Sequence, residues 1–155
     1  MTTTPEQQLA LLDLVLPPAL PAFGEYVSAV VSGDLLHVGG HFGTKDDGSA
    51  WTGKVGRLVG VDEAREAARS AAVKLLSTVR AALGSLDEVE QVVRVYGVVN
   101  ADPDFAEHTR VIDAASALLV SVFGEVGRHV RLAVGVSSLP ADLVLEIEAT
   151  IRVRR

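Results

Sequence analysis

The 155-residue chain contains no cysteine, and this absence removes several kinds of site at once. Without thiols there can be no disulfide framework, no thiolate nucleophile and no cysteine-ligated zinc. Aromatic residues are also scarce, at 5% of the chain, so the hydrophobic 48% consists mainly of alanine, valine and leucine. A sheet that stacks nucleic-acid bases needs aromatic side chains, and the strands predicted below show no such pattern.

Long apolar runs and a basic charge excess are missing too. No uncharged apolar stretch reaches the ~20 residues of a transmembrane helix. The first residues lack the basic and apolar regions of a secretory signal peptide. We therefore expect a cytoplasmic protein with no membrane partner. The net charge of −6 argues against a nucleic-acid partner, because neutralising phosphates requires a basic face.

Motifs for cofactors are absent as well. No Walker loop, Gly-x-Ser-x-Gly elbow or dinucleotide fingerprint follows a predicted strand. The four histidines, His37, His41, His108 and His129, are scattered and form no His-x-x-x-His pair. We therefore expect neither a metal nor an organic cofactor. A mean hydropathy of +0.32 is high for a monomer of this size, so part of the apolar surface is expected to lie between subunits.

The apolar spacing predicts a single domain over residues 1–155, in which a helix and a proline-rich lead-in occupy 1–21. Helices are predicted over 5–16, 62–83 and 105–123, with Asp62 as an N-cap and Gly84 as a helix end. Strands are predicted over 26–31, 35–39, 89–99, 128–136 and 143–153, and a glycine-rich loop over 44–60 includes a short edge strand around Trp51. The β-branched run over 89–99 is typical of a strand covered on both faces. This order predicts an α+β fold, a single mixed β-sheet with two long helices packed on one face.

Arg131 is the strongest candidate for a binding residue. A guanidinium stays protonated and matches a carboxylate with two parallel hydrogen bonds. An isolated arginine near a strand end usually faces water. Here it lies among Val130, Leu132 and Val134, and Gly135 leaves the nearby backbone approachable, which favours a ligand contact.

Glu146 is the second candidate. A period of two places Glu146 and Glu148 on one face of their strand. Such a pair is either solvated or, close to an arginine and a small pocket, able to orient a water molecule. Spacing alone does not decide between these interpretations.

Tyr26 opens the first predicted strand, and Gly39, Gly40 and His41 close the second. Adjacent glycines at a strand end allow a tight bend or a bulge and expose backbone N–H groups that can receive an anion. His41 could then be a general base, but the residues alone favour a surface histidine on a loop.

Several segments, in order and with sensible spacing, resemble the Rid family (reactive intermediate deaminases, also called YjgF-type or endoribonuclease L-PSP proteins). They are Gly-Glu-Tyr-Val at 24–27, Val-Gly-Gly-His at 38–41, Leu-Gly-Ser-Leu-Asp-Glu-Val at 83–89, Val-Val-Asn-Ala-Asp-Pro-Asp-Phe at 98–105, Val-Phe-Gly-Glu at 122–125, Arg131, Leu-Pro at 139–140 and Glu-Ile-Glu-Ala at 146–149. The resemblance covers about four-fifths of the chain. The N-terminal helix indicates a longer branch of the family than its smallest members.

The resemblance implies a chorismate-mutase-like fold and a homotrimer with ligand clefts between subunits. It also implies hydrolysis of 2-imino and enamine acids, such as 2-aminoacrylate, to 2-keto acids and ammonia, without a cofactor. By position, Arg131 would hold the substrate carboxylate, the backbone at Gly40 and Ala133 would contact the ligand, and Tyr26 would line the cleft. Glu146 would position the attacking water.

The chain departs from the family pattern at four places. Gly39-Gly40-His41 replaces the usual Ser-Gly-Gln, Leu132 and Ala133 replace a small polar residue and a frequent cysteine, and Ser116 stands where the second long helix commonly carries asparagine. Backbone roles survive these changes, whereas side-chain contacts with the ligand differ. A non-catalytic trimer that binds small carboxylates is therefore an alternative to the hydrolase, and the ribonuclease of the older family name is a weaker one.

Overall fold

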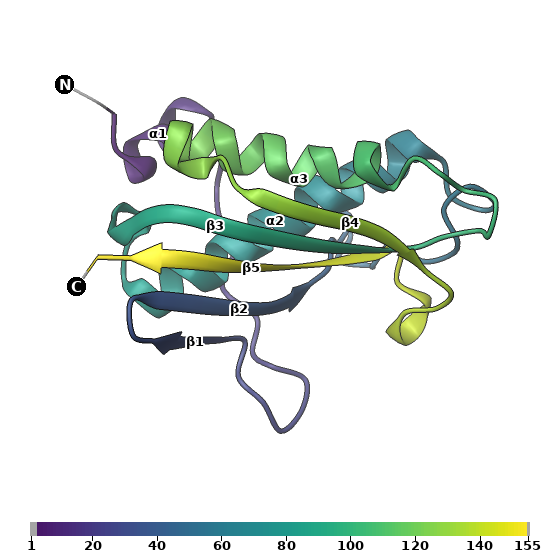
Figure 1. Cartoon of the computed structure of the whole chain (residues 1–155), viewed down its shortest axis with the longest axis horizontal. Coiled ribbons are helices and arrows are strands. Elements are labelled where there is room, and N and C mark those ends of the chain that lie inside the picture. Colours follow the sequence, from purple (N-terminus) through teal and green to yellow (C-terminus); the bar gives the residue numbers. More distant parts are fainter. Residues whose placement is uncertain (1–2, 155) are drawn as a thin grey trace.

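A computed structural model describes residues 3–154 and confirms the predicted α+β class with one mixed sheet. The strands are β1 (Ala29–Ser32), β2 (Leu35–His41), β3 (Val89–Asn100), β4 (Val130–Val136) and β5 (Leu145–Val153). They lie in the order β1-β2-β5-β3-β4 (Figure 1), and only the β3–β4 pair is parallel. The helices are α1 (Pro5–Leu11), α2 (Val61–Leu83) and α3 (His108–Phe123).

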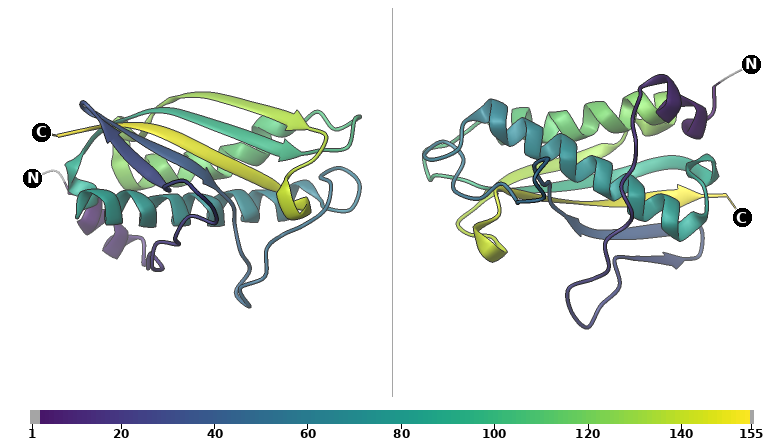
Figure 2. Two further views of the ribbon diagram at one scale, coloured as in Figure 1. Left: turned by 90° about the horizontal axis from the view of Figure 1, so that it is seen from below. Right: turned by 180° about the vertical axis from the view of Figure 1, so that it is seen from behind.

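Helices α2 and α3 cover the same face of the sheet, as predicted, and the opposite face is left open (Figure 2). The side of α2 that faces the sheet is rich in alanine, which lets the helix approach closely. Ala64, Ala67, Ala68, Ala71 and Ala72 are all at most 1% exposed. Gly43 shows how close this contact is, because a Cβ atom there would lie 2.3 Å from the Ala67 carbonyl oxygen. Burial of this apolar layer is the main stabilising term of the fold.

Several predicted boundaries are wrong. The N-terminal helix ends at Leu11 rather than at 16, since Asp13 adopts a left-handed conformation. Gly60, not Asp62, is the N-cap of α2, while Gly84 ends this helix in the predicted left-handed conformation. The edge strand around Trp51 is reduced to isolated bridges such as Thr52–Leu143.

Four further elements start later than predicted. β5 begins at Leu145 rather than at 143. β1 begins at Ala29, so Tyr26 lies in the segment before this strand. α3 begins at His108, after a turn in which the Phe105 N–H donates to the Asp102 carbonyl. β4 begins at Val130. β3 is not covered on both faces, because Arg94 points to the open side. In each case tertiary contacts override a local propensity.

The pairing register sorts side chains into rows that cross the sheet. One row, Val38, Ala149, Val95 and Arg131, faces the helices. Three rows face the open side. The first contains Val30, His37, Thr150, Arg94 and Val130, the second contains Glu148, Tyr96 and Leu132, and the third contains Glu146, Val98 and Val134. Val30, Val130 and Leu132 are among the exposed large apolar residues.

The two glycines at the end of β2 form the predicted bulge. Val38 pairs with Ala149 and His41 with Ile147, so two residues of β2 oppose one of β5. A bulge adds one residue and reverses the faces that follow it. His41 consequently points to the helix side, where an unbulged strand would have placed it on the open side.

A buried polar group closes the end of the sheet at which the chain passes from β4 to β5. Asn100 is fully buried; its side chain accepts from Lys54 Nζ (2.9 Å) and donates to Asp142 Oδ1 (2.9 Å). Lys54 Nζ also donates to the Ser137 carbonyl. Ala141 and Asp142 both have positive φ values, a conformation that costs energy in residues other than glycine. The Asn100 contacts hold this turn in place.

Helix α1 is tied to the end of α2 by one carboxylate. Glu6 accepts from the Arg80 guanidinium through both oxygens and from the Leu86 N–H at 2.9 Å. The Arg80 hydrogen bond lowers the pKa of Glu6, whereas burial opposes this shift without cancelling it. None of the helices in residues 3–154 has the length and apolarity that crossing a membrane would require.

The Glu6 contacts predict a pH-dependent anchor. Because the pKa of Glu6 is lowered by folding, its contribution is present at neutral pH and is lost as the pH falls through the folded-state value. We expect Glu6→Gln to lower the free energy of unfolding by roughly 0.5–1 kcal/mol at pH 7, since the pair is partly exposed. Urea titrations at pH 7 and pH 3 test this. A difference that is equal at both pH values would contradict it.

Candidate functional site

Arg131 lies in the helix-facing row but at the outer strand, where its side chain reaches α3. Its Nη1 donates to Asp113 Oδ1 and to Ser116 Oγ, both at 3.0 Å, and Nη2 donates to the Thr109 carbonyl at 3.4 Å. The Arg131 side chain is 17% exposed, whereas that of Asp113 is 64% exposed. The guanidinium is thus largely enclosed and oriented, unlike an arginine that simply faces water.

Arg131 and Ser116, each a candidate by the family resemblance, are joined by a residue that the sequence analysis did not single out. His129 Nε2 lies 2.9 Å from Ser116 Oγ, and His129 Nδ1 lies 2.7 Å from the Gly127 carbonyl oxygen. A carbonyl only accepts, so Nδ1 carries the proton and Nε2 accepts from the serine hydroxyl. Burial lowers the pKa of His129, and Arg131 lowers it further. The imidazole is therefore neutral near pH 7.

His41 has the same hydrogen-bonding pattern on the same, helix-covered side, toward the opposite edge of the sheet. Its Nδ1 lies 2.8 Å from the Gly39 carbonyl oxygen and its Nε2 lies 2.7 Å from Thr78 Oγ1 of α2. Burial lowers the pKa of His41, and the Lys74 charge lowers it further. The alternative of a surface histidine is wrong. As a general base His41 is also poorly placed, because a hydroxyl already occupies its free lone pair.

Tyr26, Gly40 and His41 come together around a small cavity of about 40 Å³ between the segment before β1 and the end of β2. The phenolic oxygen of Tyr26, Oη, accepts from the Phe23 N–H at 3.4 Å, which leaves the hydroxyl proton of Tyr26 for another partner. Lys74 also lines this cavity, with Nζ 5.1 Å from the centre of the Phe42 ring. Burial lowers the pKa of Lys74. The space suits one small polar group or a few waters.

Glu146 lies beside this cavity but on the open face of the sheet. A Cβ atom on Gly40 would be 3.2 Å from Glu146 Oε1, so glycine is what lets the carboxylate approach the bulge. Burial raises the pKa of Glu146. A carboxylate whose charged form is disfavoured accepts a proton near neutral pH more readily than an ordinary glutamate does.

Arg131 and Glu146 do not converge within one chain. They point to opposite faces, and their strands are separated by β3, a spacing of roughly 10 Å across the sheet. Ala133 shares the helix-facing side with Arg131 and packs partly against the core. The predicted residues thus form two groups, the arginine cluster (Asp113, Ser116, His129, Arg131) and the bulge group (Tyr26, Gly40, His41, Glu146).

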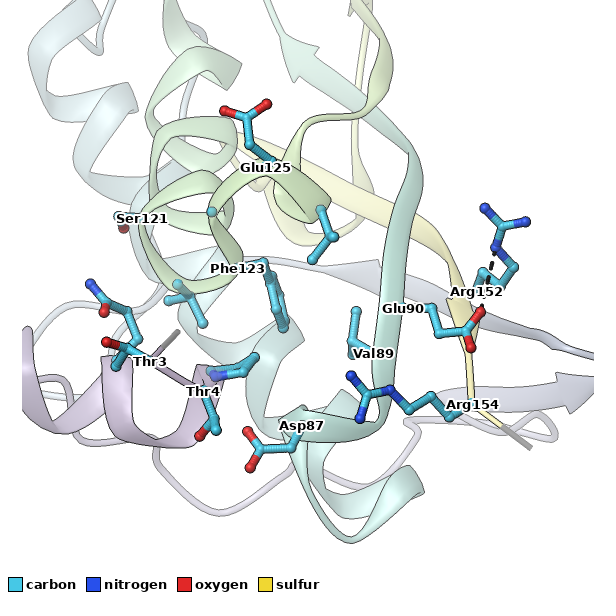
Figure 3. A pocket seen from close by; sticks show the side chains of 15 residues that line it. Thr3, Thr4, Asp87, Val89, Glu90, Ser121, Phe123, Glu125, Arg152 and Arg154 are labelled. Carbon is cyan, nitrogen blue, oxygen red and sulfur yellow. Dashed lines mark ion pairs between the residues drawn. The ribbon is translucent and has the colours of Figure 1, made fainter. Parts of the chain in front are cut away.

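A wide surface hollow contains none of these residues. It measures about 910 Å³ and lies where the start of α1, the end of α3 and the last strand meet (Figure 3). Its charges are mixed, with Arg152 3.9 Å from Glu90 and with Arg154 and Asp87 nearby. In residues 3–154 no three potential metal ligands gather at one point.

Sequence reasoning missed Asp113, His129, Thr78 and Lys74. Asp113 and Ser116 are three residues apart on a helix and so share a face. His129 and Arg131 are two apart in extended chain and so share a side. These spacings could have indicated the arginine cluster. Nothing local indicates that His41 meets Thr78, because that contact depends on the bulge.

Comparison with known proteins agrees with the sequence features. Residues 6–147 match the family described as "YjgF/chorismate_mutase-like, putative endoribonuclease". A Trypanosoma cruzi protein named TCP17 is 44% identical over 144 residues, which cover 92% of this chain and 90% of that protein.

Two solved structures share the fold along almost the whole chain. One is a protein of unknown function from Agrobacterium tumefaciens, 40% identical with a TM-score of 0.88, covering 97% of this chain and 92% of that one. The other, from Shewanella oneidensis, is described as a "putative endoribonuclease"; it is 29% identical with a TM-score of 0.92 and covers 97% and 99%. The N-terminal helix and lead-in are therefore within the matched length.

The raised pKa of Glu146 predicts a stability cost. Burial favours the neutral carboxyl in the folded state, so stability falls as the pH rises through the folded-state value. We expect Glu146→Gln, which carries no charge, to unfold at a higher temperature than wild type at pH 8, and the gain to disappear at pH 4. Thermal unfolding at both pH values measures this, with the exposed Glu66→Gln as control. A lower unfolding temperature for Glu146→Gln at pH 8 would contradict it.

Proposed function

The chain belongs to the YjgF/chorismate mutase-like family, to which the Rid proteins belong, and on this premise we propose that it hydrolyses reactive 2-imino and enamine acids to 2-keto acids and ammonia. The substrate is a small carboxylate, Arg131 holds it, and Glu146 positions water. The reaction takes place in a cleft between two subunits of a homotrimer and needs no cofactor.

The observation that carries this proposal is the state of Arg131. Its three hydrogen bonds use three of the five N–H donors of a guanidinium, so two remain for a ligand. Asp113, mostly exposed, already presents a carboxylate to Nη1 and shows that this edge of the guanidinium accepts one. The Arg131 side chain is largely enclosed and hydrogen bonds hold its guanidinium, so it offers a carboxylate a preorganised partner.

The reaction requires little of the protein beyond orienting the substrate and one water molecule. Water adds to the carbon of the C=N bond, the resulting carbinolamine loses ammonia, and a 2-keto acid remains. Glu146 accepts a proton from the attacking water and returns it to the departing nitrogen. Its raised pKa suits both steps. Gly40 adjoins this carboxylate, and Tyr26 and Gly40 line the neighbouring cavity.

Two copies of the chain are required to bring the groups together. Arg131 and Glu146 face opposite sides of the sheet, so one subunit would supply the arginine cluster and its neighbour the bulge group. The open face offers a surface for such assembly, since Val30, Val130 and Leu132 are about half exposed or more. Closed symmetric oligomers bury patches of this kind.

The two alternatives have weaker support. A non-catalytic carboxylate-binding trimer would use Arg131 alone and would leave the buried charge of Glu146 without a purpose. A ribonuclease would need accessible acid–base groups, but both nitrogens of His41 and of His129 are engaged, and the net charge of −6 repels a polyanion.

Arg131→Lys tests the carboxylate contact. An ammonium cannot reproduce the two-pronged geometry, so we expect affinity for pyruvate or 2-ketobutyrate to fall by on the order of 1.5–3 kcal/mol and ammonia release from fresh 2-imino acids to fall with it. Calorimetric titration measures the first and an ammonia assay the second. Arg128→Lys is the matched control, because Arg128 bonds through its side chain to Glu125. Equal affinities for wild type and Arg131→Lys would make the arginine structural.

Mixing two inactive variants tests the shared site. Arg131→Ala alone should bind substrate poorly, and Glu146→Gln alone should turn over roughly 10²-fold more slowly than wild type. Trimers refolded from a 1:1 mixture should recover about one quarter of wild-type activity, because one interface in four pairs an intact Arg131 with an intact Glu146. Light scattering should give a trimer. No recovery on mixing, or a stable monomer, would mean that the site does not span subunits.

A further inference from the structure

The arginine cluster contains a continuous chain of hydrogen bonds that ends on the main chain. Arg131 Nη1 donates to Ser116 Oγ, the Ser116 hydroxyl donates to His129 Nε2, and His129 Nδ1 donates to the Gly127 carbonyl. The direction of each bond is fixed, because a guanidinium only donates and a carbonyl only accepts. Bonds aligned in this way polarise one another.

We propose that His129 is a positioning residue which, through the Ser116 hydroxyl, fixes the Arg131 guanidinium in the orientation that receives a ligand carboxylate. This deepens the proposed function and rests on it only for the identity of the ligand. His129 bonds to Ser116 and not to the guanidinium, so its effect on the guanidinium is indirect.

Ser116 cannot hold Arg131 well without this acceptor. A serine inside a helix readily turns its hydroxyl to the carbonyl four residues earlier. That rotation would redirect the lone pair that Arg131 uses. With His129 in place the hydroxyl proton is committed to Nε2, and the lone pair stays toward the guanidinium.

The other contacts of Arg131 do not replace this one. Asp113 is largely exposed, so water competes for its carboxylate, and the Thr109 carbonyl is at the long limit of 3.4 Å. An arginine side chain loses rotamer entropy when it is fixed, so an arginine that is already held in place spares the ligand part of that cost. The neutral state of His129, favoured by its burial and by Arg131, keeps the acceptor available at physiological pH.

A double-mutant cycle on keto-acid affinity tests the proposal. His129→Phe and Ser116→Ala should each weaken binding of 2-ketobutyrate by about tenfold, and the double variant should bind no more weakly than Ser116→Ala. His129→Gln, whose amide oxygen can accept from Ser116, should restore most of the affinity. Ser121→Ala is the matched control, since this hydroxyl on the same helix donates to the Leu118 carbonyl. Additive losses, or full affinity in His129→Phe, would overturn the proposal.

A second measurement does not depend on the ligand. In wild type, NMR of the Arg131 guanidinium should show slow rotation about Nε–Cζ, and ¹⁵N shifts of His129 should show a proton on Nδ1 alone. In Ser116→Ala the rotation about Nε–Cζ of Arg131 should become fast. This variant tests the same hydrogen-bond chain if His129→Phe does not fold. Free rotation in wild type would overturn the positioning role even if ammonia is released. If wild type neither binds keto acids nor releases ammonia but shows the slow rotation, the proposed function fails and the positioning role stands.

Discussion

The alternation of side chains across a sheet with one covered face governs the rest of this structure. Helices α2 and α3 protect one side, so each residue of β3, β4 and β5 is committed to a packed or an open environment by its register alone. Arg131 falls in a helix-facing row and Glu146 in an open one. A residue cannot change face without a bulge. The separation of the two candidate groups therefore follows from backbone pairing and does not depend on side-chain rotamers.

The bulge at Gly39 and Gly40 breaks this alternation at the end of β2, and it creates the second group. It turns His41 toward Thr78 on the helix side, and the glycine at 40 leaves room for the Glu146 carboxylate on the other. Bulges commonly re-aim a side chain beside a functional site. Here the same extra residue both secures His41 and makes space next to an acidic group.

The two enclosed histidines show how a polar group is accommodated beside an apolar core. Each donates from Nδ1 to a glycine carbonyl two residues earlier and accepts at Nε2 from a helix hydroxyl. This arrangement satisfies both nitrogens in the neutral form and thereby avoids the cost of burying a charge. Glu146 is the opposite case, a half-buried carboxylate whose charge costs stability, and such costs are typical of functional positions.

The sequence by itself determined the elements and the candidates. Alanine and leucine spacing indicated α2, Gly84 its end, the paired glycines a bend or a bulge, and the order of segments the family. Arg131 and Glu146 were noticeable as charged residues in apolar surroundings, and Ser116 was noticeable through its place in the family pattern. Only the tertiary structure decided which of them meet. The side of the sheet on which a residue lies depends on the pairing register and, for His41, on the extra residue of the β2 bulge. Contacts such as His129–Ser116 join side chains from separate elements. Local pattern specifies local conformation, because it acts over one or two turns of chain. Long-range proximity depends on how the helices and strands pack, and no short pattern contains it.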